Sequence, residues 1–285
     1  MSISNSAMLV ELNISVWTAA VTDRKATAKV TDDAKASADA GQFKKNLMAG
    51  TTLRKEIADY AAICRTWHNG RTMPWSDRGP RLLPTSMFFE YKQEANAKRD
   101  YFMDKVERFC AAYPDLVDAA KQNLGDLYRA EDYPSVDDVR NKFGFQLVFS
   151  PVPESSDFRL VAADADLAEL KAQYDNAYEA RVKDAMQSAW DKLHDMLTKM
   201  TEKLSEPEGE DAKPKLFHAS FITNVHDMCG MLSHFNITKD PQLEEARRAL
   251  EKLVSNVDID DIRKDLGTRI DLKSQVEHVL GKFDW

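Results

Sequence analysis

The chain has 285 residues and a net charge of −8, with 43% hydrophobic and 30% charged residues, which is the composition of a folded protein with a sizeable core. Its ten Gly and ten Pro are too few for the turns of an all-β sandwich, and its three scattered cysteines cannot form a disulfide framework. Since no run reaches the roughly 18 apolar residues that span a membrane and the N-terminus lacks a signal-peptide pattern, we expect a soluble protein of a reducing cytoplasm.

The N-terminal part of the chain predicts one strand and two helices. Apolar residues alternate with polar ones over 9–17, which is the period of a half-buried strand. Ala, Lys and Asp dominate residues 19–40 and predict surface helix with a thin apolar stripe. Apolar residues recur at spacings of three and four over 53–67, and this pattern predicts an amphipathic helix that ends at the stop signal Asn69-Gly70.

A long loop and two further helices are predicted next. Residues 70–85 hold three prolines and two glycines, a density that predicts an irregular loop. Long loops in compact domains are often functional. The apolar pattern predicts a helix from Ser86 to about residue 112, after which Pro114 restarts a short helix. Ser135, with an acid three residues later, predicts the cap of a helix over 136–142.

A small sheet and one long helix are predicted in the middle of the chain. Short strands are expected at 145–150 and 157–162, and the strand at 9–17 is expected to join them in an antiparallel sheet, because a hairpin alone is marginal. One apolar stripe runs over 166–204, where a helix would be about 55–60 Å long at 1.5 Å per residue. Since this stripe is too long to bury internally, we expect a homo-oligomer.

The C-terminal part is predicted to be helical. Residues 205–214 are acidic and contain Pro and Gly, which is typical of a linker. Asp240 before Pro241 has the pattern of an N-cap followed by Pro at the first helical position. Helices are expected at 216–235, 241–254 and 273–283.

Together these elements predict an α+β fold that is mostly α. A small antiparallel sheet is flanked by helices, and one long amphipathic helix leads to a C-terminal helical segment. The predicted division is an α+β core with the long helix over 1–204, an acidic linker over 205–214 and a C-terminal helical segment over 215–285.

Positive charge is concentrated in one segment of the chain. Residues 41–81 carry eight Lys or Arg residues and three acids, a balance of +5, so the other 244 residues sum to −13. A basic segment can hold a polyanion locally even when the rest of the protein repels it at long range. Ordinary variation of charge along helix faces is the alternative explanation.

Familiar catalytic patterns are absent from the sequence. There is no glycine-rich phosphate-binding fingerprint, no G-x-S-x-G and no H-E-x-x-H. We therefore predict no catalytic residue and no cofactor, with an enzyme site that lacks a motif as an alternative. Cys64 with His68, and His226 with Cys229, have spacings that suit a zinc set. Buried cysteines and surface histidines are the favoured interpretation, so no metal site is predicted.

Tryptophan and arginine cluster around the predicted loop. Aromatic rings stack on unpaired bases and guanidinium groups bind phosphate, so this composition is compatible with nucleic-acid binding. The same residue types are typical of protein interfaces, and packing over a helix end is a third interpretation. The predicted residues for nucleic-acid or partner binding are Trp67, Arg71, Trp75, Arg78, Arg81, Lys44 and Lys45.

Four stretches of the chain resemble an uncharacterised family of tailed-phage proteins, which is related to a domain of unknown function often encoded near MoxR-type AAA+ ATPases. They are LNISVWTAAVTDRKAT (12–27), TWHNGRTMPWSDRGPRLLP (66–84), DYPSVDDVRNKFGFQLVFSPVPESSDFR (132–159) and NVHDMCGMLSHFNITKDPQLE (224–244). The resemblance implies a phage origin and a setting in the host cytoplasm. It suggests an AAA+ ATPase as partner by association only, and it transfers no active-site residue.

Two functions are predicted from these observations. The first is a non-enzymatic, oligomeric phage protein that binds nucleic acid, in single-stranded form, during replication, recombination or genome protection. The alternative is a protein-interaction module or inhibitor that acts on a host or phage factor. Its contact surface would be the loop rich in Trp and Arg or the acidic body.

Overall fold

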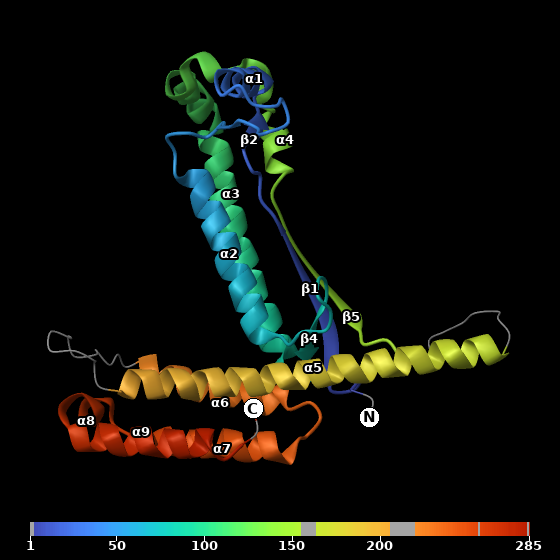
Figure 1. The fold of residues 1–285 in the computed structure, drawn as a ribbon, viewed down its shortest axis with the longest axis vertical. Coiled ribbons are helices and arrows are strands. Elements are labelled where there is room, and N and C mark those ends of the chain that lie inside the picture. Colours follow the sequence, from blue (N-terminus) through green and yellow to red (C-terminus); the bar gives the residue numbers. More distant parts are fainter. Residues whose placement is uncertain (1–2, 155–163, 206–219, 256, 284) are drawn as a thin grey trace. The chain divides into compact units, whose positions relative to one another are not determined.

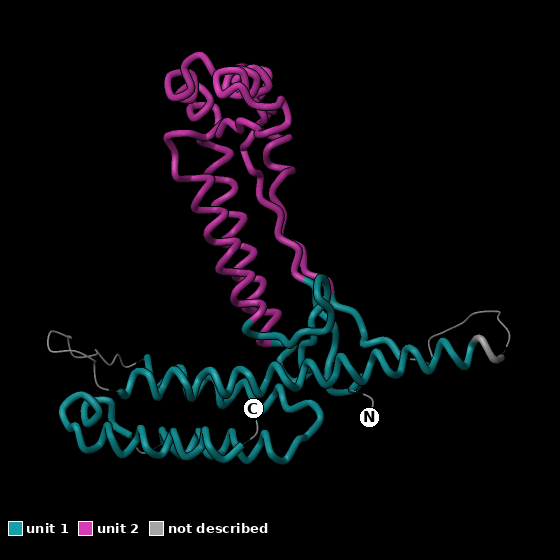
Figure 2. Tube along the Cα trace, in the orientation of Figure 1, with its two compact units in different colours: residues 1–11, 70–89, 149–285 teal, residues 12–69, 90–148 magenta. Residues whose placement is uncertain are grey.

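The computed structural model of the protein is a mostly helical α+β fold with a small antiparallel sheet, as predicted (Figure 1). The chain forms two compact units, which have different colours in Figure 2 and are described separately below. Unit 1 comprises residues 1–11, 70–89 and 149–285, and unit 2 comprises residues 12–69 and 90–148. The structure describes residues 3–154, 164–205, 220–255, 257–283 and 285.

Two small sheets contain the described strands. The larger has the order β4-β1-β5, formed by β4 (Arg81–Pro84), β1 (Ala7–Ser15) and β5 (Gly144–Pro151). Strands β1 and β4 are antiparallel, with Ala7 opposite Pro84 and Val10 opposite Arg81. The smaller sheet pairs β2 (Ala20–Thr22) with β3 (Lys44–Asn46) in antiparallel register. The predicted strands at 9–17 and 145–150 are therefore confirmed.

The segment 70–85 is not wholly irregular, which corrects the loop prediction. It contains β4, and Met73 forms an isolated bridge to Leu82 with two backbone hydrogen bonds of 2.9 Å. The side chains of Leu82 and Leu83 are fully buried. Burial against β1 therefore outweighs the proline content, and Pro84 occupies the end of an edge strand, where a missing N–H is tolerated. The predicted strand at 157–162 lies outside the described residues, and the third described strand of this sheet is β4, which pairs with β1 and not with β5.

Unit 2 is built around the antiparallel helices α2 and α3 (Figure 1). Phe102, Val106 and Phe109 of α3 are fully buried and form one core with Trp17 and Ile57. The last two residues of α2 and the first two of α3 belong to unit 1. The helices and 3₁₀ turns that contribute to unit 2 are α1 (Arg24–Asp33), α2 (Leu53–Arg71), α3 (Phe88–Leu124), η2 (Gly125–Leu127), η3 (Ala130–Asp132) and α4 (Val136–Arg140).

Helix α3 is one continuous helix of 37 residues, which corrects the predicted restart at Pro114. Proline removes one backbone hydrogen bond and normally bends or ends a helix. Here Pro114 is exposed, while Cys110 and Tyr113 before it and Ala120 after it are buried. Burial on both sides of the proline keeps the two segments in one helix. The cap predicted at Ser135 is confirmed, since its hydroxyl accepts a hydrogen bond from the Asp138 N–H.

Unit 1 contains the long predicted helix, α5 (Asp164–Leu204), which packs along α6, α7 and α9 (Figure 1). The predicted cap at Asp240 is confirmed, because its Oδ1 accepts a hydrogen bond of 2.8 Å from the Gln242 N–H. Helix α8 and the first turns of α9 extend the helical content beyond the prediction. The C-terminal helices are α6 (Ser220–Phe235), α7 (Pro241–Ser255), α8 (Ile259–Lys264) and α9 (Leu266–Leu280), and η1 (Thr85–Met87) also lies in this unit.

The apolar stripe of α5 is buried along its C-terminal half. Ala189, Leu193 and Leu197 are inaccessible to solvent and face the neighbouring helices of the unit. The predicted homo-oligomer stays a prediction, which light scattering against the 32.3 kDa of one chain tests. Unit 1 holds α5 together with the C-terminal helices, whereas the predicted domain division separates them at a linker. Residues 206–219, which include most of that linker, lie outside the described residues.

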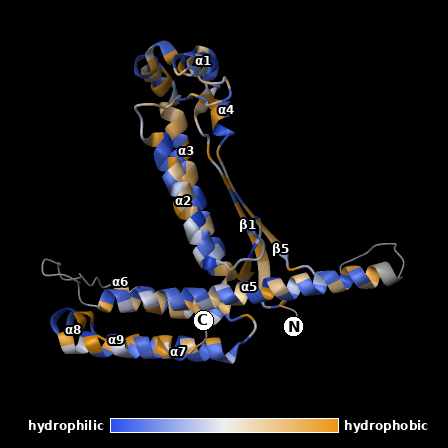
Figure 3. Cartoon of the chain, viewed as in Figure 1, coloured by the Kyte–Doolittle hydropathy of each residue, from blue (hydrophilic) through white to orange (hydrophobic). Residues whose placement is uncertain are grey.

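Both hydrophilic and hydrophobic residues can be seen along α3, α5 and α7 in Figure 3. Within the described part of the chain, we find no helix with the length and hydropathy needed to cross a membrane.

Candidate anion-binding site

The residues predicted to bind nucleic acid or a partner do not belong to one compact unit. Lys44, Lys45 and Trp67 lie in unit 2. The other four residues lie in unit 1, and these are Arg71, Trp75, Arg78 and Arg81. The predicted site is therefore divided between the two units, and each part is described in its own surroundings.

Trp75 is part of the packing of unit 1. Its side chain is 4% exposed, and its ring lies edge-on to Tyr178 at 5.6 Å between centroids, with the Arg181 guanidinium 5.6 Å from its centroid. Arg81 has a local role too, since its Nε donates to Thr72 Oγ1 at 2.7 Å. A ring with so little exposure has no face for a base, so the contacts of Trp75 support a packing role.

Trp67 lies on a surface between α2 and α3 in unit 2. Its ring stacks on Tyr91 at 4.8 Å with an interplanar angle of 22°, and its Nε1 donates to Glu94 Oε2 at 2.5 Å. The Lys98 ammonium lies 5.1 Å from the ring centroid. Trp67 is half-buried, so part of its ring remains accessible. Both polar and cationic partners are thus already present around this tryptophan.

The remaining predicted residues differ in their exposure. Lys44 and Arg78 are exposed, and Arg71 is half-buried. Lys45 is the exception, because its side chain is only 2% exposed. The two neighbouring lysines of β3 therefore have opposite environments, as expected for alternate residues of a strand. The buried member, Lys45, belongs to a cluster of charged side chains.

The Lys45 ammonium joins three segments of unit 2. It donates a hydrogen bond of 2.9 Å to the Leu127 carbonyl and lies 2.5 Å from Asp132 Oδ2 and 3.4 Å from Asp23 Oδ2. The Asp132 contact is an ion pair, since that oxygen accepts no hydrogen bond from a described residue. Lys45 thus donates hydrogen bonds to Leu127 O and Asp23 Oδ2 and has a third oxygen, of Asp132, within ion-pair distance, and these contacts offset the desolvation of its charge.

Asp23 caps helix α1 and completes this cluster. Its Oδ1 accepts hydrogen bonds of 3.0 Å from the backbone N–H groups of Lys25 and Ala26. Arg129 lies 3.8 Å from the same oxygen. The hydrogen bond from Ala26, helped by the charges of Arg129 and Lys45, lowers the pKa of Asp23 below its ordinary value. Asp23 is therefore ionised, and it holds the start of α1 beside β3.

These residues line an open pocket of about 340 Å³. Four of the lining side chains are cationic and two are carboxylates, which gives the pocket a balance of +2. Arg24 and Lys25 are exposed at its mouth, and neither makes an ion pair with a residue that the structure describes. The lining residues are Thr22, Asp23, Arg24, Lys25, Lys45, Arg129 and Asp132.

The pocket suits an anion that binds to side-chain cations. The first free amides of α1 already bind Asp23, so the helix terminus itself offers little to a ligand. The positive charge of Lys45 is balanced by its ion pairs with the two carboxylates. Arg24 and Lys25 have no such partner among the described residues. Arg129, with 36% of its side chain exposed, lines the pocket from the extended position directly before η3. Guanidinium and ammonium groups at one pocket are the usual partners of phosphate.

The two candidate metal-binding pairs do not form one site within either unit. Cys64 and His68 lie in unit 2, and His226 and Cys229 lie in unit 1. His68 is buried and its Nδ1 lies 2.7 Å from the Tyr91 hydroxyl. Burial raises the pKa of the Cys64 thiol, and it raises that of Cys229 to about 11. Among the described residues, no group of three or more His, Cys, Asp or Glu side chains is arranged to hold a metal.

Comparisons of this chain with protein-family models, with curated proteins and with solved structures find no match.

Proposed function

We propose that the protein binds nucleic acid, in single-stranded form, through the pocket at the start of α1. The observation that carries this proposal is the excess of cationic side chains at a single pocket of a chain whose net charge is −8. An acidic protein repels nucleic acid at a distance, so binding depends on cations gathered at one place. A phage protein with this property in the host cytoplasm would fit replication, recombination or genome protection.

An aromatic pair beside the pocket supports the preference for single strands. Tyr128 precedes Arg129 in the chain and is half-buried. Its ring stacks on Tyr133 at 5.3 Å with an interplanar angle of 28°. Unpaired bases stack on exposed aromatic faces, while paired bases in a duplex cannot. A phosphate held by Arg129 would bring a neighbouring base within reach of this pair.

The test is fluorescence anisotropy with labelled 20-nucleotide single-stranded DNA, the same sequence as duplex, and single-stranded RNA. Sequence-independent binding of this kind has dissociation constants of roughly 1–100 µM at physiological salt. Arg24→Glu with Lys25→Glu should weaken binding at least tenfold. If Arg24, Lys25 and Arg129 each contact one phosphate, the logarithm of affinity should fall with the logarithm of salt with a slope of about −2.

The matched control is Lys199→Glu with Lys203→Glu, which makes the same change in net charge on two exposed lysines of α5 in unit 1. This control should bind nucleic acid as the unmodified protein does. Equal weakening in both variants would mean that only net charge matters, and it would overturn the pocket assignment. Absence of binding by the unmodified protein at about 100 µM would overturn the proposed function.

A second candidate function is protein binding through the face of α2 and α3 around Trp67, which we call the aromatic stripe. Ile63 and Tyr101 are 57% and 50% exposed there. Tyr60 lies edge-on to Tyr101 at 4.7 Å, and the Lys105 ammonium is 5.0 Å from the Tyr101 ring centroid. Aromatic rings with exposed apolar neighbours are typical of protein hot spots. The lysines of the stripe already lie over rings, which favours a protein over a phosphate chain.

This second candidate is tested by placing a photo-crosslinking amino acid at Ile63 or at Tyr101, and at Ala119 as the control. Ala119 is an exposed residue of α3 outside the stripe. A partner at the stripe, whether an AAA+ ATPase or another host or phage factor, should give one discrete crosslinked product from positions 63 and 101 only. Products that are identical from all three positions, or absent from all three, would contradict a specific interface.

A further inference from the structure

We propose that a second pocket, between α5 and α6 in unit 1, binds an acidic peptide segment through one large apolar side chain. The pocket has a volume of about 120 Å³. Roughly 300–1,000 Å³ is usual for sites that enclose a small molecule, so this pocket suits a single side chain. It is lined by Met196, Lys199, Met200, Lys203, Phe221 and Asn224.

The floor of this pocket is apolar and adaptable. Met200 is fully buried, Phe221 is 6% exposed and Met196 is half-buried. The residues from α5 have spacings of three and four, so they share one face of that helix. Methionine side chains are unbranched and polarizable and adjust to differently shaped partners. A Leu, Met or Phe side chain would therefore find both contact and room in this pocket.

The rim of the pocket is cationic. Lys199 and Lys203 are exposed, and neither makes an ion pair with a described residue. Lys203 also lies over the Phe221 ring, with its ammonium 5.5 Å from the centroid. Like charges one helical turn apart repel each other weakly. Carboxylates on both sides of an inserted apolar side chain would relieve this repulsion, so charge complementarity selects an acidic partner.

The occupant that follows from these features is a peptide with an apolar anchor and flanking Asp or Glu residues. A basic peptide with the same anchor would meet two ammonium groups at the rim. An acidic peptide without the anchor would leave the Met and Phe floor uncovered. The two halves of the site can therefore be tested separately, and neither depends on the pocket of unit 2.

The probe is a fluorescein-labelled peptide EEDLLDEE, measured by anisotropy with the full chain at moderate salt. The unmodified protein should bind it with a micromolar dissociation constant. Its binding should exceed that of EEDSSDEE and of KKRLLRKK by at least tenfold. Lys199→Glu with Lys203→Glu should weaken binding of EEDLLDEE at least tenfold, as should Met196→Glu, which puts a charge on the floor. Lys29→Glu with Lys183→Glu, at exposed lysines that line neither pocket, is the control of equal charge change and should bind normally.

A second readout locates the bound peptide. The chain has eleven methionines, and ¹³C-methyl labelling reports on each of them. Addition of EEDLLDEE should shift the Met196 and Met200 methyl signals and leave most others unchanged. Equal binding of EEDLLDEE and EEDSSDEE, an unchanged affinity in the Lys199/Lys203 variant, methyl shifts elsewhere, or no binding at all would each overturn this proposal.

Discussion

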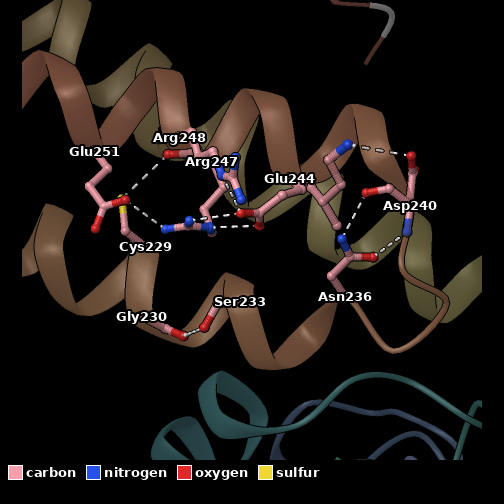
Figure 4. Close-up of polar contacts among 10 residues, drawn as sticks. Cys229, Gly230, Ser233, Asn236, Asp240, Glu244, Arg247, Arg248 and Glu251 are labelled. Atoms are coloured by element: carbon pink, nitrogen blue, oxygen red, sulfur yellow. Dashed lines mark hydrogen bonds and ion pairs between the residues drawn. The ribbon is translucent and has the colours of Figure 1, made fainter.

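The two units each contain a cluster of charged side chains, and the clusters differ in almost every physical respect. In unit 2, Lys45 joins Asp23 and Asp132, with side-chain exposures of 2%, 3% and 15%. In unit 1, Arg247 and Arg248 join Glu244 and Glu251 along α7, as Figure 4 shows. The first cluster is buried and brings together distant segments, whereas the second follows one helix at the surface.

The two clusters differ in how much of the hydration of their charges is lost on folding. On α7, Glu244, Glu251 and Arg248 keep 30%, 49% and 72% of their side chains exposed, and Arg247 keeps 13%. Because three of the four side chains stay in contact with water, pairs at spacings of three and four add at most about 1 kcal/mol each. In the buried cluster, Lys45 and Asp23 are 2% and 3% exposed, so they have lost most of their water and depend on their protein partners. Lys45 and the Leu127 carbonyl are 82 positions apart in the chain. Ion pairs of similar length therefore connect distant segments of the chain in unit 2, whereas in unit 1 they stabilise a single helix locally.

The largest effect is expected from Lys45→Met, which removes the one cation of the described residues that contacts both Asp23 and Asp132. Because Asp23 and Asp132 would remain charged or have to take up protons in a desolvated place, the free energy of unfolding should fall by about 3–5 kcal/mol. Urea unfolding followed by circular dichroism measures this change. Lys44→Met is the matched control on the exposed side of β3 and should change stability by less than about 0.5 kcal/mol. Similar values for the two variants would contradict a cross-linking role.

A smaller and more informative effect is expected from Asp132→Asn. Lys45 would keep its hydrogen bond to Leu127 and its contact with Asp23. The unfolding free energy should therefore fall by about 1–2 kcal/mol. The same change raises the balance of the pocket from +2 to +3, so affinity for single-stranded DNA should rise severalfold while stability falls. Glu131→Gln, at an exposed neighbour outside the pocket, should lower stability by less than about 0.5 kcal/mol. If Asp132→Asn lowered both the stability and the affinity for single-stranded DNA, the result would contradict binding of nucleic acid at this pocket.

Features that depend on neighbouring residues could be predicted from the sequence. The alternation in β1 and β5, the apolar spacing in α2 and α5, and the caps at Ser135 and Asp240 are each visible within about ten residues. The ion pairs of α7 belong to the same class, because their spacing of three and four is visible in the sequence. In all these cases the local pattern and the tertiary structure agree.

Features that depend on distant contacts were missed. Strand β4 exists because Leu82 and Leu83 are buried opposite β1, a pairing that a proline-rich segment does not reveal. The pocket of unit 2 combines Asp23, Lys45 and Arg129 from separate segments, and only Lys45 was among the predicted binding residues. Its buried position gives Lys45 a structural role, and the exposed cations beside it, Arg24 and Lys25, are the ones that we propose bind the anion. An acid directly before the basic start of a helix was the one local signal of this site.

The smallest effect is expected from Glu244→Gln in the surface cluster. Hydrogen bonds from Arg247, with that of Arg248 and both positive charges, lower the pKa of Glu244 from 4.5 to about 2. A lowered pKa in the folded state means that the ion pair stabilises the protein above about pH 4.5 and that this stabilisation is lost as the pH falls toward about 2.

Because the site is partly solvated, Glu244→Gln should reduce the unfolding free energy by only about 0.5–1 kcal/mol at neutral pH. The difference from the unmodified protein should shrink when urea unfolding is repeated at about pH 3. Asp227→Asn, at an exposed carboxylate of α6, is the control and should change the unfolding free energy by less than about 0.5 kcal/mol at neutral pH. A Glu244→Gln difference above about 3 kcal/mol would place this surface cluster with the buried one and remove the contrast between the two units.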